Sequence, residues 1–128
     1  NIDITLDINE EFEIFMDSYE LERVVDNTIA NAIKYSFEDS TIEISLDKEN
    51  GNYTLSIKDE GIGIVDKEAI FQAYYQQKDK NIGFGLGLSI VKEICDKYEI
   101  RIEVNSLNNQ TTFSYIFPKD LISKGEIL

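Results

Sequence analysis

Residues 42–64, with the sequence IEISLDKENGNYTLSIKDEGIGI, contain the pattern that decides the fold. Apolar and polar residues alternate over residues 42–46 and again over residues 53–57, which is the period of half-buried strands. The segment between them, residues 49–52, reads ENGN, a composition typical of a turn. We therefore predict a β-hairpin that ends at Asp59.

Similar alternation occurs near both ends of the chain. Residues 2–8 and residues 12–16 alternate apolar and polar side chains, so we predict that the chain opens with a hairpin. Residues 100–104 and 112–117 predict a final pair of strands. Because hairpins pair strands in antiparallel fashion, they contribute antiparallel pairs to the predicted sheet.

Two further segments have the helical period. Asp17 followed by Glu20 resembles a capping box, and apolar residues recur at helical spacing behind it, which predicts a helix over about residues 18–36. A second helical pattern covers residues 86–98. Strands and helices are interspersed, so the fold class is α+β, with helices covering one face of a mixed sheet.

The size and charge of the chain limit what it can be and bind. Its 128 residues fit one domain. With 25 acidic and 12 basic side chains the formal charge is −13, which repels nucleic acid and anionic lipid surfaces. An anionic nucleotide can still bind where local cations, a metal ion or backbone N–H groups overcome that field.

Cellular location is constrained by cysteine content and hydropathy. Cys95, the one cysteine, lies in an apolar helical pattern, so we expect a buried, inert thiol. No apolar run approaches the roughly 20 residues that span a bilayer. We expect a cytoplasmic domain without direct membrane contact. The chain begins at Asn1 and its one methionine is Met16, which suggests a fragment of a longer parent protein, and that parent could be an inner-membrane protein.

Polar residues on the first predicted helix form a row. Asn27, Asn31 and Lys34 are spaced by four and three residues, which places two amides and an ammonium on one helix face. Asparagine is a poor helix former, so two in one row need a reason. On spacing alone, a solvated polar face remains the favoured interpretation.

Two glycine-rich segments follow. Residues 59–64, DEGIGI, place a carboxylate at a strand end before two glycines that let a flat ligand approach the backbone; an ordinary turn explains them equally well. Residues 83–88, GFGLGL, lead into a helix whose backbone N–H groups can hold phosphates. A flexible connector is the alternative. The spacing of residues 83–88 fits neither the dinucleotide fingerprint nor a Walker loop with its lysine.

In this order, the segments resemble the four boxes of the catalytic ATP-binding domain of sensor histidine kinases in two-component systems, a branch of the Bergerat-fold superfamily that includes DNA gyrase. Residues 21–36 resemble the N box, residues 59–64 the G1 box, residues 70–75 the F box and residues 83–88 the G2 box. The resemblance covers about residues 11–117. It implies a two-layer α/β sandwich, with a mixed, mostly antiparallel sheet packed against about three helices.

The resemblance also implies roles for individual residues. Asn31 would hold Mg²⁺ through its side-chain oxygen, and Asn27 would lie near the phosphates. Lys34 and Tyr35 would contact phosphate and nucleotide, and Asp59 would accept a hydrogen bond from the adenine amino group. The other implied nucleotide contacts are Gly61, Gly63, Ile64, Phe71 (which would anchor the ATP lid), Gly83, Phe84, Gly85, Leu86, Gly87 and Leu88.

By the same resemblance the chain would bind Mg-ATP and donate the γ-phosphoryl group to a histidine. Gyrase-type ATPases carry a glutamate general base where this chain has Asn27, which favours transfer over hydrolysis. The chain contains no histidine, so the acceptor would lie on an absent helical phosphoacceptor domain of the same, dimeric parent. A response regulator would act downstream.

Two other functions remain open at this stage. A serine kinase of the anti-sigma-factor type shares the fold and would phosphorylate a serine of a partner protein. A nucleotide-responsive docking module would signal without catalysis, and the short predicted lid over residues 77–82 supports it.

Overall fold

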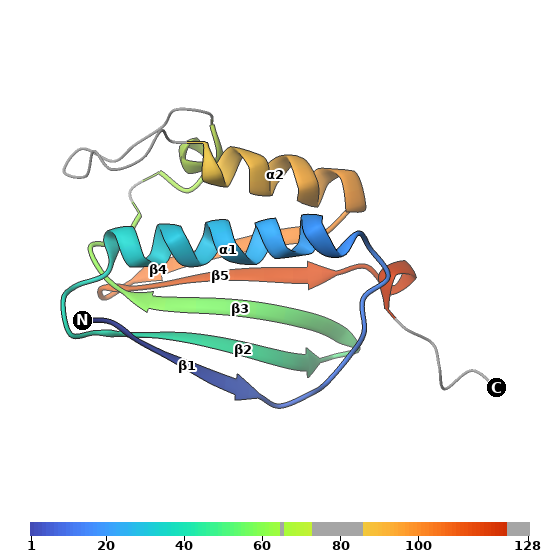
Figure 1. The fold of residues 1–128 in the computed structure, drawn as a ribbon, viewed down its shortest axis with the longest axis horizontal. Coiled ribbons are helices and arrows are strands. Elements are labelled where there is room, and N and C mark those ends of the chain that lie inside the picture. Colours follow the sequence, from blue (N-terminus) through green and yellow to red (C-terminus); the bar gives the residue numbers. More distant parts are fainter. Residues whose placement is uncertain (65, 73–85, 123–128) are drawn as a thin grey trace.

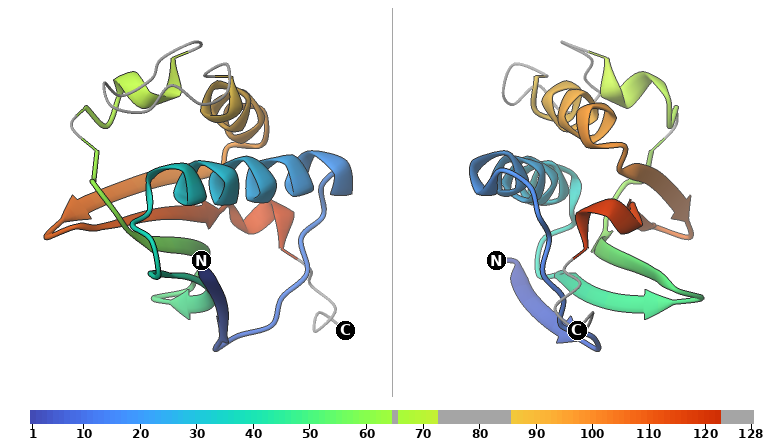
Figure 2. Two further views of the ribbon diagram at one scale, coloured as in Figure 1. Left: turned by 60° about the vertical axis from the view of Figure 1, so that its left-hand side comes forward. Right: turned by 90° about the vertical axis from the view of Figure 1, so that its right-hand side faces the viewer.

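The computed structural model describes residues 1–64, 66–72 and 86–122, and these form one five-stranded sheet with two α-helices on the same side of it (Figures 1 and 2). The elements, in chain order, are β1 (Asp3–Ile8), α1 (Ser18–Tyr35), β2 (Thr41–Glu49), β3 (Asn52–Glu60), the 3-10 turn η1 (Ala69–Phe71), α2 (Gly87–Tyr98), β4 (Arg101–Leu107), β5 (Gln110–Phe117) and the 3-10 turn η2 (Lys119–Leu121). The expected α+β class is confirmed.

The sheet has the strand order β1-β2-β3-β5-β4. β1 pairs with β2 in parallel, and every other pair is antiparallel, so the sheet is mixed and mostly antiparallel as expected. The predicted hairpin is the β2–β3 pair, and its turn has Asn50 and Gly51 at φ 54° and 82°. Strands β4 and β5 confirm the predicted final pair.

The prediction of an opening hairpin is wrong. Residues 2–8 contain β1, whose partner is β2, with Ile4 opposite Ile42. Within the described residues, residues 12–16 contribute a single bridge, between Ile14 and Ile122. Alternation determines which side chains share a face, but it does not identify the partner strand, and here that partner comes from beyond a whole helix.

Helix α1 begins where its capping residue predicts. The side chain of Asp17 accepts hydrogen bonds from the backbone N–H groups of Tyr19 and Glu20, at 2.8 and 3.1 Å. Its buried stripe, Val24, Thr28 and Ala32, has the spacing of four that faces a sheet.

No helix in the described ranges is both long enough and apolar enough to span a membrane.

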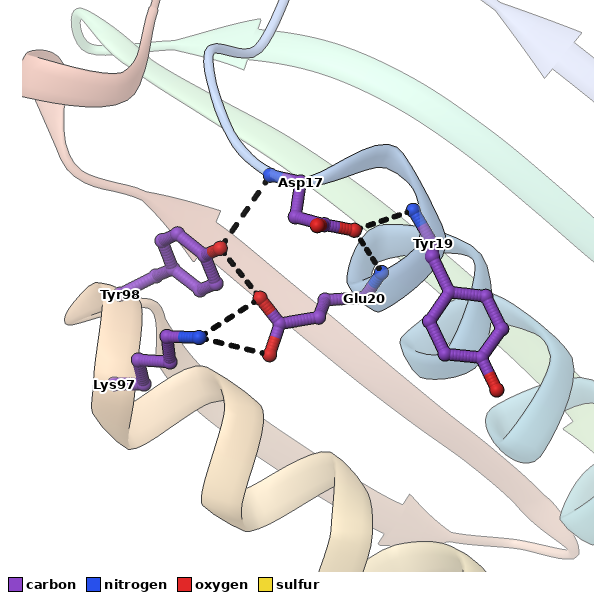
Figure 3. Close-up of polar contacts among 5 residues, drawn as sticks. All are labelled: Asp17, Tyr19, Glu20, Lys97 and Tyr98. Carbon is purple, nitrogen blue, oxygen red and sulfur yellow. Dashed lines mark hydrogen bonds and ion pairs between the residues drawn. The ribbon is translucent and has the colours of Figure 1, made fainter.

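The predicted capping box is only half formed, because Glu20 bonds to α2 instead (Figure 3). Its carboxylate accepts hydrogen bonds from Lys97 at 3.0 Å and from the Tyr98 hydroxyl at 2.5 Å. The Asp17 N–H donates to the Tyr98 hydroxyl at 3.4 Å. Hydrogen bonds from Tyr98 and Lys97 hold the pKa of Glu20 below its ordinary value. This helix clasp joins the start of α1 to the end of α2.

The main core lies between the two helices and strands β3 and β5. Phe113, Tyr115 and Val91 are among its fully buried side chains. Cys95 is buried there too, as predicted, and burial raises the pKa of its thiol to about 12. At neutral pH this cysteine is therefore a protonated, inaccessible and unreactive side chain.

One polar contact is enclosed in this core. The hydroxyl of Thr28 donates to the Val24 carbonyl at 2.7 Å and lies 2.5 Å from the Tyr115 hydroxyl. Since the threonine proton is used within α1, the tyrosine is left to donate to Thr28. Desolvation by burial raises the pKa of Tyr115, which keeps this proton in place.

Replacing Thr28 with valine is expected to lower the free energy of unfolding by about 1–3 kcal/mol, because the buried Tyr115 hydroxyl loses its partner. Urea unfolding of the variant measures this. The double variant Thr28→Val, Tyr115→Phe should recover part of the loss, since it leaves no unpaired hydroxyl. A single variant as stable as the original chain would contradict this account.

Candidate functional site

A buried carboxylate marks the end of β3. The strand buries alternate residues, Leu55, Ile57 and then Asp59, so its period carries an acid into a core position where it is 3% exposed. Desolvation by burial raises the pKa of Asp59 to about 7. No residue in the described ranges donates a hydrogen bond to this carboxylate. Buried polar groups are seldom left unpaired, so this one points to a ligand with a donor.

Two hydroxyl side chains next to Asp59 were missed by the sequence interpretation. Thr111 of β5 is directly opposite Asp59 in the ladder and is 2% exposed. Its hydroxyl lies 3.0 Å from that of Ser106 on β4, which in turn accepts the Ile64 N–H at 2.9 Å. These contacts hold the backbone after the glycines against the sheet beside the carboxylate.

The first glycine of the G1 segment fastens the end of β3 to the end of α1. A Cβ placed on Gly61 would lie 2.1 Å from the Tyr35 carbonyl oxygen, so a side chain has no room there. The next N–H, of Ile62, donates to that same oxygen at 3.2 Å. Gly63 has φ +84°, which favours glycine. Both residues therefore shape the floor of the site.

The predicted polar row lies on α1 along the side that faces α2. Asn27, Asn31 and Lys34 are all half-buried, so the row is more enclosed than the solvated face that spacing alone favours. The Lys34 ammonium lies 5.2 Å from the centre of the Tyr35 ring, at the end of α1 where Gly61 is packed. The row of polar side chains therefore runs along α1 toward Gly61.

The start of α2 meets the N-terminal end of this row, at Asn27. A Cβ on Gly87 would lie 3.5 Å from the side-chain oxygen of Asn27. The N-cap residue of α2, Leu86, makes no side-chain capping hydrogen bond. Uncapped N–H groups at a helix N-terminus attract anions. An anionic ligand bound at this end would therefore lie close to the Asn27 amide of α1 as well.

The remaining predicted site residues are divided between core, surface and residues outside the described ranges. Phe71 is half-buried against Phe113, with ring centres 6.2 Å apart at 75°, which fits a lid anchor. Leu88 is buried in the core and Leu86 is exposed. Gly83, Phe84 and Gly85 lie outside the described residues, as does the predicted lid at 77–82.

The arrangement can hold a planar base with an amino group at one end and an anionic tail at the other. Asp59 offers an acceptor with no donor among the described residues, and the start of α2 offers backbone N–H groups that its N-cap side chain does not bind. Within the described ranges, no three acidic, cysteine or histidine side chains converge as metal ligands. A Mg²⁺ ion here would take oxygens from Asn31, from ligand phosphates and from water, which suits its preference.

Comparison with known proteins identifies the family to which the chain belongs. Residues 16–121 match the family model described as histidine kinase-, DNA gyrase B- and HSP90-like ATPase. Sensor protein kinase WalK of Staphylococcus aureus is 40% identical over 122 residues, which cover 86% of this chain and 29% of that protein. WalK of Staphylococcus aureus strain JH9 matches with the same identity over 20% of its length. The chain therefore spans less than a third of either relative.

Several solved structures of histidine kinases are similar to this chain in fold. A mycobacterial sensor histidine kinase, MprB, has a TM-score of 0.81 at 25% identity, covering 91% of this chain and 83% of that one. The nucleotide-free catalytic domain of histidine kinase ThkA has a TM-score of 0.78 at 28% identity, covering 92% and 79%. Full-length ShkA in complex with AMPPNP has a TM-score of 0.75 at 26% identity, covering 91% and 25%.

Proposed function

This chain belongs to the family of histidine kinase-, DNA gyrase B- and HSP90-like ATPases, and we propose that it binds Mg-ATP and donates the γ-phosphoryl group to a histidine of a separate domain. The observation that carries the proposal is the buried Asp59 carboxylate near Gly61, which has no hydrogen-bond donor among the described residues. An adenine amino group would supply the missing donor. The AMPPNP bound in the related ShkA structure supports a nucleotide as the ligand.

In this proposal each part of the site has one task. The Asp59 carboxylate binds the adenine amino group, while Thr111 and Ser106 hold the wall beside it. The N-terminus of α2 binds phosphate through backbone N–H groups, and Lys34 adds a positive charge at the end of α1. Mg²⁺, held by Asn31, would neutralise phosphate charge when bound. Most of the rate enhancement would then come from positioning and charge neutralisation.

Asn27 favours transfer over hydrolysis. Its amide lies against Gly87. Gyrase-type ATPases carry a glutamate general base at the matching position, and a neutral amide does not accept a proton from water. In the proposed reaction the bond from Pγ to the bridging oxygen of ADP breaks and a P–N bond to imidazole forms. The chain has no histidine, so the acceptor is a phosphoacceptor domain of the parent protein, which we propose to be a dimer that passes the group to a response regulator.

The proposed nucleotide site can be tested by calorimetry. We expect ADP and a non-hydrolysable ATP analogue to bind, and Mg²⁺ to strengthen the binding. A phosphotransfer assay then compares a histidine-bearing helical hairpin with a serine-bearing anti-sigma-factor partner. Transfer to histidine alone supports the proposed activity. Binding without transfer to either acceptor would favour a docking module.

Replacing Asp59 with asparagine is expected to weaken ADP binding by about 1.5–3 kcal/mol, the range for a hydrogen bond to a charged group. This corresponds to a roughly tenfold to hundredfold loss of affinity. Asp120→Asn, at an exposed position, is the matched control and should leave the affinity unchanged. Equal affinities for the two variants would remove Asp59 from the adenine site.

The same residue predicts a pH dependence of stability. Burial raises the pKa of Asp59 from its ordinary 3.8 to about 7. Between these two pH values the Asp59 carboxyl is protonated in the folded chain and ionised in the unfolded chain. Its contribution to the free energy of unfolding is therefore full below about pH 4 and is lost as the pH rises to about 7. The loss is about 4 kcal/mol. Urea unfolding from pH 5 to 8 should show a steeper decline than Asp59→Asn does, and parallel curves would contradict the raised pKa.

A further inference from the structure

One row of large apolar side chains is left open to solvent at the edge of the sheet. Ile4, Leu6 and Ile8 of β1 are 48%, 68% and 51% exposed. They alternate with polar residues, so all three share one face of the strand. Their partners in the ladder, Ile42, Ile44 and Leu46 of β2, are buried or half-buried against the core. This β1 apolar face therefore continues the core side of the sheet.

The face is open because the helical layer ends before it. Strands lie about 4.8 Å apart, so the axes of five strands span about 19 Å. Two helices packed about 10 Å apart cover most, but not all, of that width. Here α1 contacts β3 and α2 contacts β4, and both views in Figure 2 show β1 at the margin away from the helices. No helix in the described part of the chain covers it.

Carboxylates line the end of this face. Beyond Ile8, a cavity of about 420 Å³ is lined by Ile8, Phe12 and Leu46, together with Glu11 and Glu13. Its floor is apolar and both of its charged groups are negative. Neither glutamate forms an ion pair with any residue that the structure describes.

The side of α1 nearest to β2 also combines apolar and acidic side chains. Ile29 packs toward Ile42 of β2, and Ile33, one turn further along the helix, is 46% exposed on the same side. Glu22 and Asp26 lie on this side by helical spacing and are exposed. They too are without an ion pair among the described residues. The β1 apolar face thus has acidic groups on its α1 side as well as at its end.

We propose that the β1 apolar face binds a basic amphipathic α-helix of a partner protein. Six residues of β1 span about 20 Å, the length of about 13 helical residues. The apolar stripe of such a helix would cover Ile4, Leu6 and Ile8, and the helix would lie beside α1 on the same side of the sheet. The lysine and arginine side chains of the partner helix would pair with the carboxylates beside the β1 apolar face.

A second copy of this chain is a poorer occupant. If β1 paired with its own copy in antiparallel register about Thr5, Asp3 would lie directly opposite Asp7 of the other molecule. Like charges in that position are destabilising. The formal charge of −13 on each chain adds long-range repulsion. The same negative charge attracts a basic partner.

The test uses the 128-residue chain and two fluorescent 14-residue peptides with one leucine stripe, flanked by lysine and arginine in one and by glutamate in the other. We expect the basic peptide to bind, to gain helical circular dichroism on binding, and to shift the amide resonances of β1 and residues 9–16. Binding of both peptides alike, a strand-like bound peptide, or shifts centred on another surface would overturn the proposal.

Matched variants separate this site from general charge attraction. Leu6→Ser should lower the affinity at least tenfold, whereas Leu107→Ser, 73% exposed on the opposite edge strand, should change it less than twofold. The double variant Glu11→Lys, Glu13→Lys should lose binding more than Glu93→Lys, Glu99→Lys on the α2 side. Equal losses within either pair would overturn the proposal, as would a dimer that Leu6→Ser dissociates. Urea unfolding confirms that each variant is folded.

Discussion

Replacing Gly61 with alanine is expected to remove at least about 4 kcal/mol of stability, a loss that only a few mechanisms produce. The added Cβ would lie 2.1 Å from the Tyr35 oxygen, 2.8 Å from the Tyr35 carbonyl carbon and 3.1 Å from the Ser36 Cα, all of them backbone atoms. Relief requires separating β3 from the end of α1. That movement breaks the bonds from Ile62 N–H to Tyr35 and from Phe37 N–H to Glu60.

Gly51 is the matched control for this substitution. Its φ of +82° strains an alanine, but no atom lies within 4 Å of the added Cβ. We expect Gly51→Ala to cost only about 1–2 kcal/mol, the cost of the backbone conformation alone. Domains have about 5–15 kcal/mol of stability in total, so urea unfolding should distinguish the two variants easily. Equal losses would show that the β3–α1 contact is not tight.

Replacing Asn31 with alanine is expected to reduce phosphotransfer by at least about a thousandfold, equivalent to about 4 kcal/mol of transition-state stabilisation. The side chain is half-buried on α1 and lies beside the buried stripe of Val24, Thr28 and Ala32 without being part of it. Alanine is a strong helix former and leaves this stripe unchanged, so the fold should survive. Calorimetry should show ADP binding that no longer responds to Mg²⁺.

Asn105→Ala removes an amide from an exposed position on β4 and is the control for this variant. It should transfer phosphate at the original rate and retain the response to Mg²⁺. Full transfer by Asn31→Ala would remove this residue from the metal site. Loss of the fold, seen in the circular dichroism spectrum, would instead assign Asn31 a structural role.

Local signals in the sequence were sufficient for much of the fold. The β2–β3 hairpin was predicted because the turn at Asn50 and Gly51 lies between its two strands, and α1 because Asp17 caps it directly. The place of β1 was not predictable in this way. Its partner β2 is 33 residues beyond its end along the chain, and no local pattern states which edge of a sheet a strand joins.

The site shows the same division. The polar row on α1 was visible because helical spacing is local, and Asp59 because it ends a predicted strand. Thr111 and Ser106 were missed, since their positions opposite and beside Asp59 depend on the register of three strands. The contact of Gly61 with Tyr35 brings a turn and a helix end together, and sequence spacing carries no information about such an encounter.

The buried thiol of Cys95 gives this chain a practical advantage for spectroscopy. It is the one cysteine of the sequence and is fully buried, with its pKa raised to about 12, so maleimide reagents will leave it unmodified in the folded chain. Cysteines introduced at exposed Glu22 and Gln72 can therefore be labelled without first deleting the native one. Donor and acceptor dyes on this pair would report the separation of α1 from η1, with and without nucleotide, in an otherwise natural background.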